Sequence, residues 1–527
     1  MTGSGFAEFN NIASPREKIK TMLEKIRARV YCIFCQCYES GAASLRSGVR
    51  GFLSKEVIMA HYQSLHIGGK YGYPMPCLEH EFRPAVLEHR LFRAQVRKSG
   101  RATPLKLAAA TPSGQVLSVE TVVYGKPDAA EAAANVRHAE RLVKSLLWIG
   151  GGSRIVVAGS DEIAAALAKI YAPDGERAFD YASMTKIYET PLAVESVPYE
   201  DAPAANEPQN GLGRHFEGCR VGFDLGASDR KCAAVQDGKV VFSEEIVWDP
   251  SKQTDPAWHH AGINDSIRRA AAHLPRVDAI GGSAAGVHIN NRVRMASLFR
   301  SVPAERFEQE AAPVFELVKS DWNGVPFEVV NDGEAAALAA SVQLGQNSIL
   351  GVSFGSSMAG GYVNPAGCIT GRLNELAFVP VDGSPSAPRD EWSGDYGCGV
   401  NYFSQQGVAR LAASAGLEFP ADMPLPQVLL EVQAMAEQGD ERALSIFRSI
   451  GTAFGYTIAG FTEFYPSIGT TVVMGRVTSG VGGDLIVREA NRILAEVFPE
   501  LKTNVAVPDD SMRRHGQAIA AATLAEI

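Results

Sequence analysis

The chain has 527 residues and a formal net charge of −9, with 46% hydrophobic and 21% charged residues. This length is greater than that of a domain with a single hydrophobic core, so we expect about two to four domains. The composition is that of an ordinary globular protein. No apolar run approaches the roughly 18 residues of a membrane span, and no basic-then-apolar leader precedes the first domain, so we expect a cytoplasmic protein without a membrane partner.

The first region, residues 1–100, is basic, with 15 Lys and Arg against 8 Asp and Glu. Apolar residues recur with helical spacing over 15–30, so we expect a mainly helical region with a surface helix there. A basic head could contact an acidic partner, but the acidic remainder argues against a nucleic-acid binder. Eight cysteines are too few and too scattered for a disulfide scaffold.

Some cysteines and histidines of this region resemble the half-sites of a zinc finger. The candidate ligands are Cys32 and Cys35 as one half and, as the other, His61 and His66 or Cys77 and His80. The 25 residues between the first pair and His61 exceed the usual finger spacing. Buried thiols and ordinary surface histidines are the alternative interpretation.

Residues 101–200 alternate between strand and helix patterns and predict an accessory α/β domain. Expected strands cover 105–109, 116–123 and 154–158, and expected helices cover 129–147 and 161–171. None of these segments resembles a catalytic motif. Residues 201–215, rich in proline, acids and glycine, predict a linker.

A new domain begins near residue 216 with a strand that runs into an acid and a turn of small residues. Asp224 follows the apolar strand, and Gly226, Ala227 and Ser228 can bring backbone N–H groups close to a phosphate. A hairpin over 231–244 follows. Taken alone, this pattern favours the start of an ordinary hairpin.

Three later segments strengthen the phosphate interpretation, with a small-residue turn at 278–286 in support. A strand at 327–330 leads into Asn331, Asp332 and a helix start, which places the acid at a helix N-terminus. A strand, loop and return strand at 348–363 repeat the first hairpin, and its loop residues are Gly355, Ser356 and Ser357. The last segment is a strand through Gly475, a loop at 480–483 and a helix from Asp484, where a nucleotide base could lie.

Together, and in this order, the segments DLGAS, VVNDGEAAALAA, GVSFGSSMAGGYV, NELAFVPVD and VVMGRVTSG resemble sugar kinases of the ROK family, within the superfamily of actin, hexokinase and heat-shock chaperone ATPases. The resemblance implies an α/β fold with two RNase H-like lobes that close on ATP and a sugar. Residues 216–331 and 510–527 would form the small lobe and residues 332–509 the large lobe, with the last helix, 513–526, packing back on the first lobe. It also suggests a homodimer.

The family resemblance implies a role for each motif residue. Asp332 resembles the general base that takes the proton of the attacking hydroxyl, and Asn331 resembles a substrate contact. Asp224 matches the acid that positions Mg²⁺-bound phosphates, and the loops 226–228 and 355–357 match backbone donors to the transferred group. Glu375 matches a glutamate that binds substrate hydroxyls, although a solvated carboxylate at a strand edge is the alternative.

Departures from the family pattern bear on metal and substrate. Phe378 stands in place of a zinc-binding histidine, and Glu391 and Ser393 replace two of three zinc cysteines, leaving Cys398, so we expect no family zinc site. Val400 replaces a family Glu near the zinc motif, and Ser297 stands where the family has an Asn that contacts the sugar. We therefore expect a deoxy, acetylated, cyclitol or otherwise altered sugar rather than plain glucose, with His288, Arg300 or the N-terminal domain supplying replacement contacts.

Three functions fit the sequence. The first is an ATP-dependent, Mg²⁺-requiring kinase acting on a hydroxyl of a sugar or polyol. The second is a sugar-sensing transcriptional regulator of the same family, although residues 1–100 show no clear helix-turn-helix. The third is a nucleotide-binding scaffold without turnover.

Overall fold

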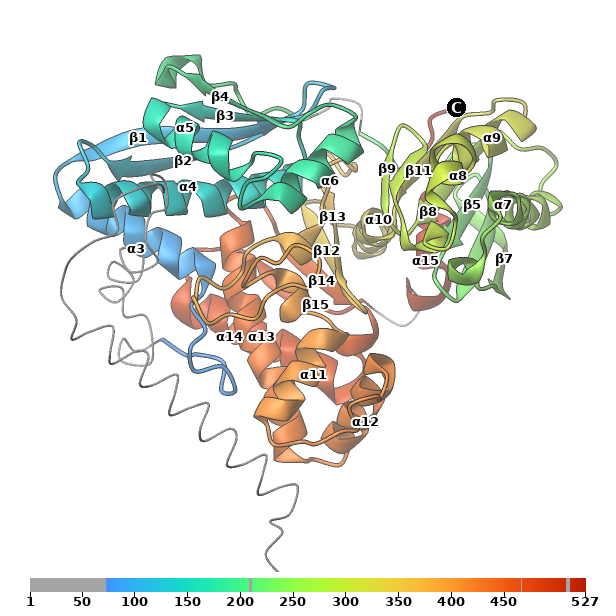
Figure 1. Cartoon of the computed structure of the whole chain (residues 1–527). Coiled ribbons are helices and arrows are strands. Elements are labelled where there is room, and N and C mark those ends of the chain that lie inside the picture. Colours follow the sequence, from blue (N-terminus) through green and yellow to red (C-terminus); the bar gives the residue numbers. More distant parts are fainter. Residues whose placement is uncertain (1–72, 208–210, 466, 509–511) are drawn as a thin grey trace, which may run out of the picture. The chain divides into compact units, whose positions relative to one another are not determined.

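The computed structural model describes residues 73–207, 211–465, 467–508 and 512–527 (Figure 1). The helix predicted over 15–30 and the candidate ligands Cys32, Cys35, His61 and His66 lie outside these residues. Among the described helices, none has the length and apolar character that crossing a membrane requires.

The first sheet has the strand order β2-β1-β3-β4. β1 (Ala102–Ala110) pairs antiparallel with both β2 (Val116–Tyr124) and β3 (Arg154–Ala158), and β4 (Ala193–Val197) pairs parallel with β3. Its helices are α3 (Ala85–Lys98), α4 (Ala129–Gly150), α5 (Asp161–Ile170) and α6 (Ala178–Tyr188). The strands and helices predicted between 105 and 171 are therefore confirmed, each within a few residues of its expected bounds.

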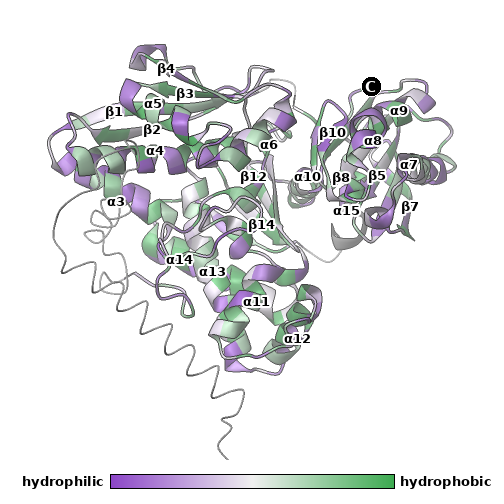
Figure 2. Ribbon diagram, in the orientation of Figure 1, coloured by the Kyte–Doolittle hydropathy of each residue, from purple (hydrophilic) through white to green (hydrophobic). Residues whose placement is uncertain are grey.

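Local sequence explains where the long helix α4 begins. Asp128 accepts a hydrogen bond from the Glu131 backbone N–H, and the Glu131 carboxylate accepts one from the Asp128 N–H, which is a capping box. Side chains such as Leu142 and Leu146 then lie one turn apart and pack against Leu107 of β1 in a buried core. Figure 2 shows hydrophobic residues concentrated on the strands and hydrophilic residues on the outer sides of the helices.

The second sheet has the order β11-β8-β5-β6-β7. Its strands are β5 (Cys219–Leu225), β6 (Asp229–Gln236), β7 (Lys239–Val247), β8 (Ala279–Ala284) and β11 (Phe327–Asn331). β5, β6 and β7 form an antiparallel meander, whereas β8 and β11 run parallel to β5. This is the RNase H-like order, and it confirms the predicted hairpin over 231–244.

Short elements and helices complete this sheet's lobe. They are α7 (Pro256–Ala271), α8 (Ala304–Arg306), α9 (Val314–Asp321), the paired strands β9 (Val287–Ile289) and β10 (Arg292–Met295), the 3-10 turns η3 (Pro250–Lys252) and η4 (Ser297–Phe299), and the π-helical turn η5 (Phe307–Ala311). The buried core of the lobe contains Phe223, Ile263, Phe315 and Phe327.

The third sheet, of order β13-β12-β14-β15, repeats most of this arrangement. β12 (Ile349–Phe354) and β13 (Met358–Val363) form an antiparallel hairpin, and β14 (Thr470–Met474) and β15 (Asn504–Ala506) add in parallel. Its helices are α10 (Asp332–Leu344), α11 (Gln405–Ser414), α12 (Leu425–Glu437), α13 (Glu441–Phe461) and α14 (Gly480–Val497). Four strand positions are common to the two sheets, and β7 has no counterpart among the described strands of the third, so the two sheets form the expected two-lobed α/β fold.

The first and third sheets share a core, so the boundary between them is less sharp than the sequence predicts. One continuous hydrophobic core contains Leu107 and Leu142 from the first sheet and Val352 and Phe454 from the third. In the predicted linker, 201–215, Leu212 forms a β-bridge with Ile369. The domain limits proposed from the sequence therefore remain predictions.

The chain returns to the second sheet through α15 (Met512–Ala521). A Cβ atom at Gly222 of β5 would lie 1.8 Å from the carbonyl oxygen of Ala518, and one at Gly281 of β8 would lie 1.7 Å from that of Ala521. Glycine at both positions lets the helix backbone approach the strands closely. This packing confirms that the last helix lies against the first lobe.

One helix boundary differs from the expectation. The loop predicted over 480–483 forms the first turn of α14, which begins at Gly480 rather than at Asp484. The three glycines in this turn have poor helix propensity, so the sequence pattern favours a loop. A Cβ at Gly483 would lie 2.0 Å from the Thr478 carbonyl, so tight packing at the start of the helix requires a glycine there.

Candidate active site

Asp224 lies at the end of β5, where the strand meets the small-residue loop. Its carboxylate is buried; Oδ1 accepts a hydrogen bond from Ser283 Oγ at 2.7 Å, and Lys231 Nζ lies 3.5 Å from Oδ2. Burial raises the pKa of Asp224, while the positive charge of Lys231 opposes the rise. Contacts from β6 and β8 therefore fix this carboxylate on a rigid sheet.

The loop after Asp224 is anchored at its base and exposed at its tip. The Gly226 N–H donates to the Asp229 carbonyl at 2.9 Å, and the Gly226 carbonyl accepts from Trp248 Nε1 at 2.8 Å. Ala227 and Ser228 at the tip are exposed. Such a turn can present backbone donors to an anion.

The second loop, between β12 and β13, is built in a similar way. The Gly355 N–H donates to the Ser357 carbonyl at 2.9 Å, and the Gly355 carbonyl accepts from the Gln405 N–H at 2.9 Å. Ser356 and Ser357 are exposed. The two hairpins thus present matching exposed tips of small residues, as the sequence predicts.

Gly475, directly after β14, packs against the end of β12, where the second loop begins. It has a φ of +97°, and a Cβ there would lie 2.5 Å from the Phe354 carbonyl oxygen, directly before Gly355. The next residue, Arg476, lies close enough to Asp229 for its charge to act there. Burial alone would raise the pKa of Asp229, but contacts with Lys231 and Ser228 and the charge of Arg476 lower it. The loops that follow β5, β12 and β14 therefore lie near one another.

Asn331 and Asp332 occupy the junction between β11 and α10. Asn331 caps the helix: its Oδ1 accepts from the Gly333 N–H at 2.7 Å, and its Nδ2 donates to the Gly286 carbonyl at 2.8 Å. Asp332 Oδ1 also accepts from the Gly333 N–H, at 2.9 Å. The Asp332 carbonyl accepts from Gln517 Nε2 of α15 at 3.0 Å. Two helices thus hold the backbone of the candidate base.

Gly333 also places this helix start against the third sheet. A Cβ at Gly333 would lie 2.3 Å from the Gly360 carbonyl of β13, and one at Gly361 would lie 2.1 Å from the Gly333 carbonyl. Asp332 therefore follows a strand of the second sheet and begins a helix that packs on the third. The predicted general base therefore lies at the junction of two sheets.

Glu375 lies beside α4, because its backbone N–H donates to the Trp148 carbonyl at 2.9 Å. The preceding Asn374 N–H donates to the Ile149 carbonyl at 3.0 Å. The last turn of α4 leaves these carbonyls without intrahelical partners, so the Asn374–Glu375 segment satisfies them. The accessory α/β region thereby positions a candidate substrate-binding residue.

The three candidate carboxylates are electrostatically linked. Burial, followed by the negative charge of Asp224, raises the pKa of Asp332 to about 6. Burial, followed by the charge of Asp332, raises the pKa of Glu375 to about 7. Carboxylates gathered in a low-dielectric place and shifted in this way are typical of sites that move protons.

The remaining predicted substrate contacts have other neighbours in the described structure. His288 Nε2 lies 3.1 Å from the Ala284 carbonyl, its ring packs edge-on against Phe315, and burial lowers its pKa to about 4. Ser297 is exposed at the start of η4, and Arg300 donates to Ser251 Oγ at 3.1 Å. Their contact with a substrate remains a prediction.

The segment that would hold the family zinc has different contacts here. Phe378 packs against Trp148, with ring centroids 4.3 Å apart, and against Phe179 at 5.2 Å. Cys398 is buried, and burial raises the pKa of its thiol to about 12. Three further positions in this segment differ from the family pattern. Glu391 is exposed, Ser393 Oγ donates to Asp390 at 2.6 Å, and Val400 is buried.

In the first region, Cys77 Sγ is exposed and lies 3.2 Å from Ser449 Oγ, and His80 is exposed. The described residues contain no group of three or more His, Cys, Asp or Glu side chains that could hold a metal ion. Metal binding by the N-terminal cysteines and histidines therefore stays an untested prediction.

Sequence reasoning missed a buried ionic cluster beside the site. Asp395 lies 2.9 Å from Arg141, 3.1 Å from Lys144 and 2.8 Å from Arg177, and all four side chains are buried. The ionic cluster consists of Glu140, Arg141, Lys144, Arg177, Asp180 and Asp395. The sequence carries little signal of it, because α4 has five charged residues in 22, close to the 21% of the whole chain.

Glu334, one turn into α10, was also missed. It is buried, its Oε1 has no hydrogen-bond partner among the described residues, and burial raises its pKa to about 8. A neutral carboxylic acid can donate a hydrogen bond, so burial in the first turn of α10 favours the protonated form of Glu334.

No protein-family model matches the chain, and no curated protein matches it in a sequence comparison. Solved structures do resemble it. A ROK hexokinase from Thermus thermophilus is 18% identical, with a TM-score of 0.45, over 58% of this chain and 97% of that one. A ROK family glucokinase from Streptomyces griseus, in complex with glucose and AMPPNP, is 20% identical, with a TM-score of 0.45, over 58% of this chain and 99% of that one.

A ROK family transcriptional regulator, a homologue of the E. coli MLC protein, is 17% identical, with a TM-score of 0.47, over 59% of this chain and 78% of that one. The family that the sequence motifs resemble is the family of these solved structures. The likeness concerns the path of the backbone, and the sugar and nucleotide named belong to those proteins.

Proposed function

We propose that the chain is an ATP-dependent kinase that phosphorylates a hydroxyl of a sugar or sugar-like polyol, with Asp332 as the general base. The observation that carries the proposal is the gathering of Asp224, Asp332 and Glu375 from three separate segments into one electrostatically linked group. Two exposed small-residue loops lie at the ends of the adjoining strands.

In this reaction Asp332 accepts the proton of the attacking hydroxyl while an oxygen–phosphorus bond forms and the bond to ADP breaks. A sugar hydroxyl is a weak nucleophile until its proton has an acceptor. A base with a pKa of about 6 is mostly ionised at neutral pH and still basic enough to take the proton. Asn331 and Glu375 would orient the substrate beside it.

The N–H groups of the loops at 226–228 and 355–357 would stabilise charge on the transferred group. The residues present fit Mg²⁺, which proteins commonly hold through one or two carboxylates together with substrate phosphates. Asp224 would supply the carboxylate, and the ion would neutralise phosphate charge when bound with ATP. Gly475 and the start of α14 would lie beside the nucleotide.

The substrate we propose is an altered sugar rather than plain glucose. Phe378 packs into an aromatic group with Trp148 and offers no polar atom, and Val400 is buried and apolar. A sugar hydroxyl buried against such a surface without a partner would cost about 1–3 kcal/mol. A deoxy, acetylated or cyclitol ring would leave fewer hydroxyls unpaired.

The test is ADP release by the purified full chain with ATP, Mg²⁺ and a panel of sugars, amino sugars and cyclitols. We expect turnover with at least one altered sugar, and a loss of about 10²- to 10⁴-fold in kcat for Asp332→Asn. Asp422→Asn is the matched control, because Asp422 is exposed in the loop before α12.

Other outcomes would identify the competing functions. Sugar-dependent retention of DNA without ADP release would replace the kinase by a regulator. Nucleotide binding with no turnover on any acceptor would replace it by a scaffold.

A further inference from the structure

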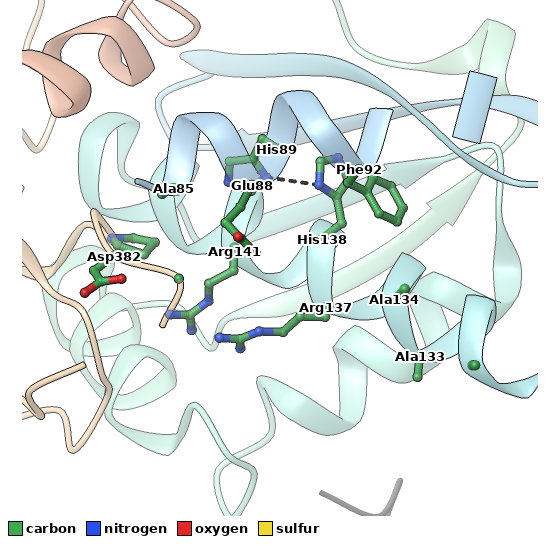
Figure 3. A pocket seen from close by; sticks show the side chains of 13 residues that line it. Ala85, Glu88, His89, Phe92, Ala133, Ala134, Arg137, His138, Arg141 and Asp382 are labelled. Atoms are coloured by element: carbon green, nitrogen blue, oxygen red, sulfur yellow. Dashed lines mark hydrogen bonds between the residues drawn. The ribbon is translucent and has the colours of Figure 1, made fainter. Parts of the chain in front are cut away.

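A pocket separate from the candidate active site lies between α3, α4 and the loop at 380–383 (Figure 3). Its volume is about 50 Å³. A buried water needs roughly 10 to 15 Å³, so this pocket can hold several waters or one molecule of a few heavy atoms. Three alanines of α4 leave the space open: Ala130, Ala133 and Ala134.

Two charged side chains that line the pocket have unused hydrogen-bonding atoms. Glu88 Oε1 and Arg137 Nη2 are buried, and neither has a hydrogen-bond partner among the residues that the structure describes. Figure 3 shows Glu88 reaching from α3 and Arg137 from α4 into the space between the helices. Buried polar atoms in native proteins are normally paired, so a bound molecule is the expected partner.

Existing contacts fix the orientation of Arg137. Its Nη1 donates to Glu140 Oε2 at 2.8 Å, and its guanidinium lies over the Tyr396 ring, 4.7 Å from the centroid. These contacts use one edge and one face of the planar group and leave Nη2 available. The stem of Glu88 passes close to the backbone of Gly383, where an added Cβ would lie 3.0 Å from Glu88 Cγ.

The other polar groups of the pocket wall already have partners. His89 and His138 face each other with their Nδ1 atoms 3.0 Å apart, and burial lowers the pKa of both, so the pair is neutral. Arg141 is paired with Glu140 and Asp395.

Asp382 accepts hydrogen bonds from the backbone N–H groups of Arg83 and Ser384 and from the Tyr402 hydroxyl. Among the polar side chains that line the pocket, the open hydrogen-bonding capacity therefore lies on one carboxylate, Glu88, and one guanidinium, Arg137.

We propose that this pocket binds a small zwitterion of the α-amino-acid type, with its ammonium on Glu88 and its carboxylate on Arg137. Such a ligand carries one positive and one negative group, so its binding supplies both open atoms with partners and adds no net charge to a buried place. Its side chain would lie against Ala134 and the Phe92 ring. The size of the pocket favours glycine or L-alanine over larger amino acids.

Isothermal titration calorimetry of the full chain with glycine and L-alanine tests the proposal. We expect saturable binding at one site, and binding at least about tenfold weaker for acetate and methylamine, which each carry only one of the two charges. Absence of saturable heat with both amino acids would overturn the proposal, as would equal binding of glycerol.

Two variants place the binding in this pocket. Glu88→Gln removes the carboxylate charge, and Ala134→Leu fills the pocket without touching either charged group, so each should weaken binding at least about tenfold. Glu200→Gln, at an exposed carboxylate in the 3-10 turn η2 (Tyr199–Asp201), is the control and should bind as the wild type does. Unchanged affinity in folded Ala134→Leu, verified by circular dichroism, would refute the site even if Glu88→Gln failed to fold.

Discussion

Replacing Lys144 by methionine should destabilise the region where α4 meets the loop at 380–398. Lys144 Nζ lies 3.1 Å from Asp180 and 3.1 Å from Asp395, and its side chain is 0% exposed. In the ionic cluster Lys144 is the cation that contacts Asp180, whereas Asp395 also contacts Arg141 and Arg177, and Glu140 contacts Arg137, Arg141 and Arg177. Lys144→Met therefore leaves the buried Asp180 carboxylate without a cation partner among the described residues.

Breaking a buried pair by removing one partner costs about 3–5 kcal/mol, because the remaining charge stays desolvated. The urea dependence of a chain of 527 residues exceeds the ~1–3 kcal/mol per M of small proteins, so the unfolding midpoint should fall by roughly 0.5–1 M. Adding Asp180→Asn removes that unpaired carboxylate and should recover part of the loss.

The assay is urea unfolding followed by tryptophan fluorescence, since Trp148 Nε1 donates to Asp180 and Trp148 lies in the affected region. Wild type, Lys144→Met and the double variant are compared in the same buffer. Two results would refute the argument that the ion pairs of Lys144 stabilise the contact between α4 and the loop at 380–398. One is a Lys144→Met unfolding midpoint equal to that of the wild type, and the other is a double variant less stable than Lys144→Met.

Three further predictions concern the candidate site and its support. Activity should rise with pH through about 6, roughly tenfold per unit below that value, because protonated Asp332 cannot accept a proton; a kcat profile that is flat from pH 5 to 7 would contradict this. Glu375→Gln, measured by the same ADP assay, should raise KM for the acceptor more than it lowers kcat, and its kcat should still rise with pH through about 6. Loss of that pH dependence in the variant would assign the titrating group to Glu375 instead. Gly222→Ala should lower the free energy of unfolding by about 1–3 kcal/mol, measured by thermal unfolding, because its Cβ would lie 1.8 Å from the Ala518 carbonyl; wild-type stability would show that α15 is not tightly packed there.

Elements with strong local signals were predictable from the sequence. The strand β3 (Arg154–Ala158) coincides with its predicted bounds because a short β-branched run is bounded by Gly-Gly-Ser and Gly-Ser. The junction at Asn331 and Asp332 was recognisable because an apolar strand, a helix-capping residue and an alanine-rich helix follow one another directly.

Features that depend on distant residues were not predictable. Arg141 and Asp395 are separated by 254 positions, so their ion pair exists only once α4 packs on the loop at 380–398. The hydrogen bond from the Glu375 N–H to the Trp148 carbonyl depends on the same packing. The glycine-rich start of α14 was misassigned because tertiary packing overrode weak helix propensity.

The central claim is that the Asp332 carboxylate takes a proton during phosphoryl transfer. The most direct measurement is the turnover of Asp332→Asn at saturating acceptor, with nucleotide affinity determined separately on the same sample. The account predicts an unchanged affinity for ATP and a kcat lower by about 10²- to 10⁴-fold. Wild-type turnover in the variant would contradict it.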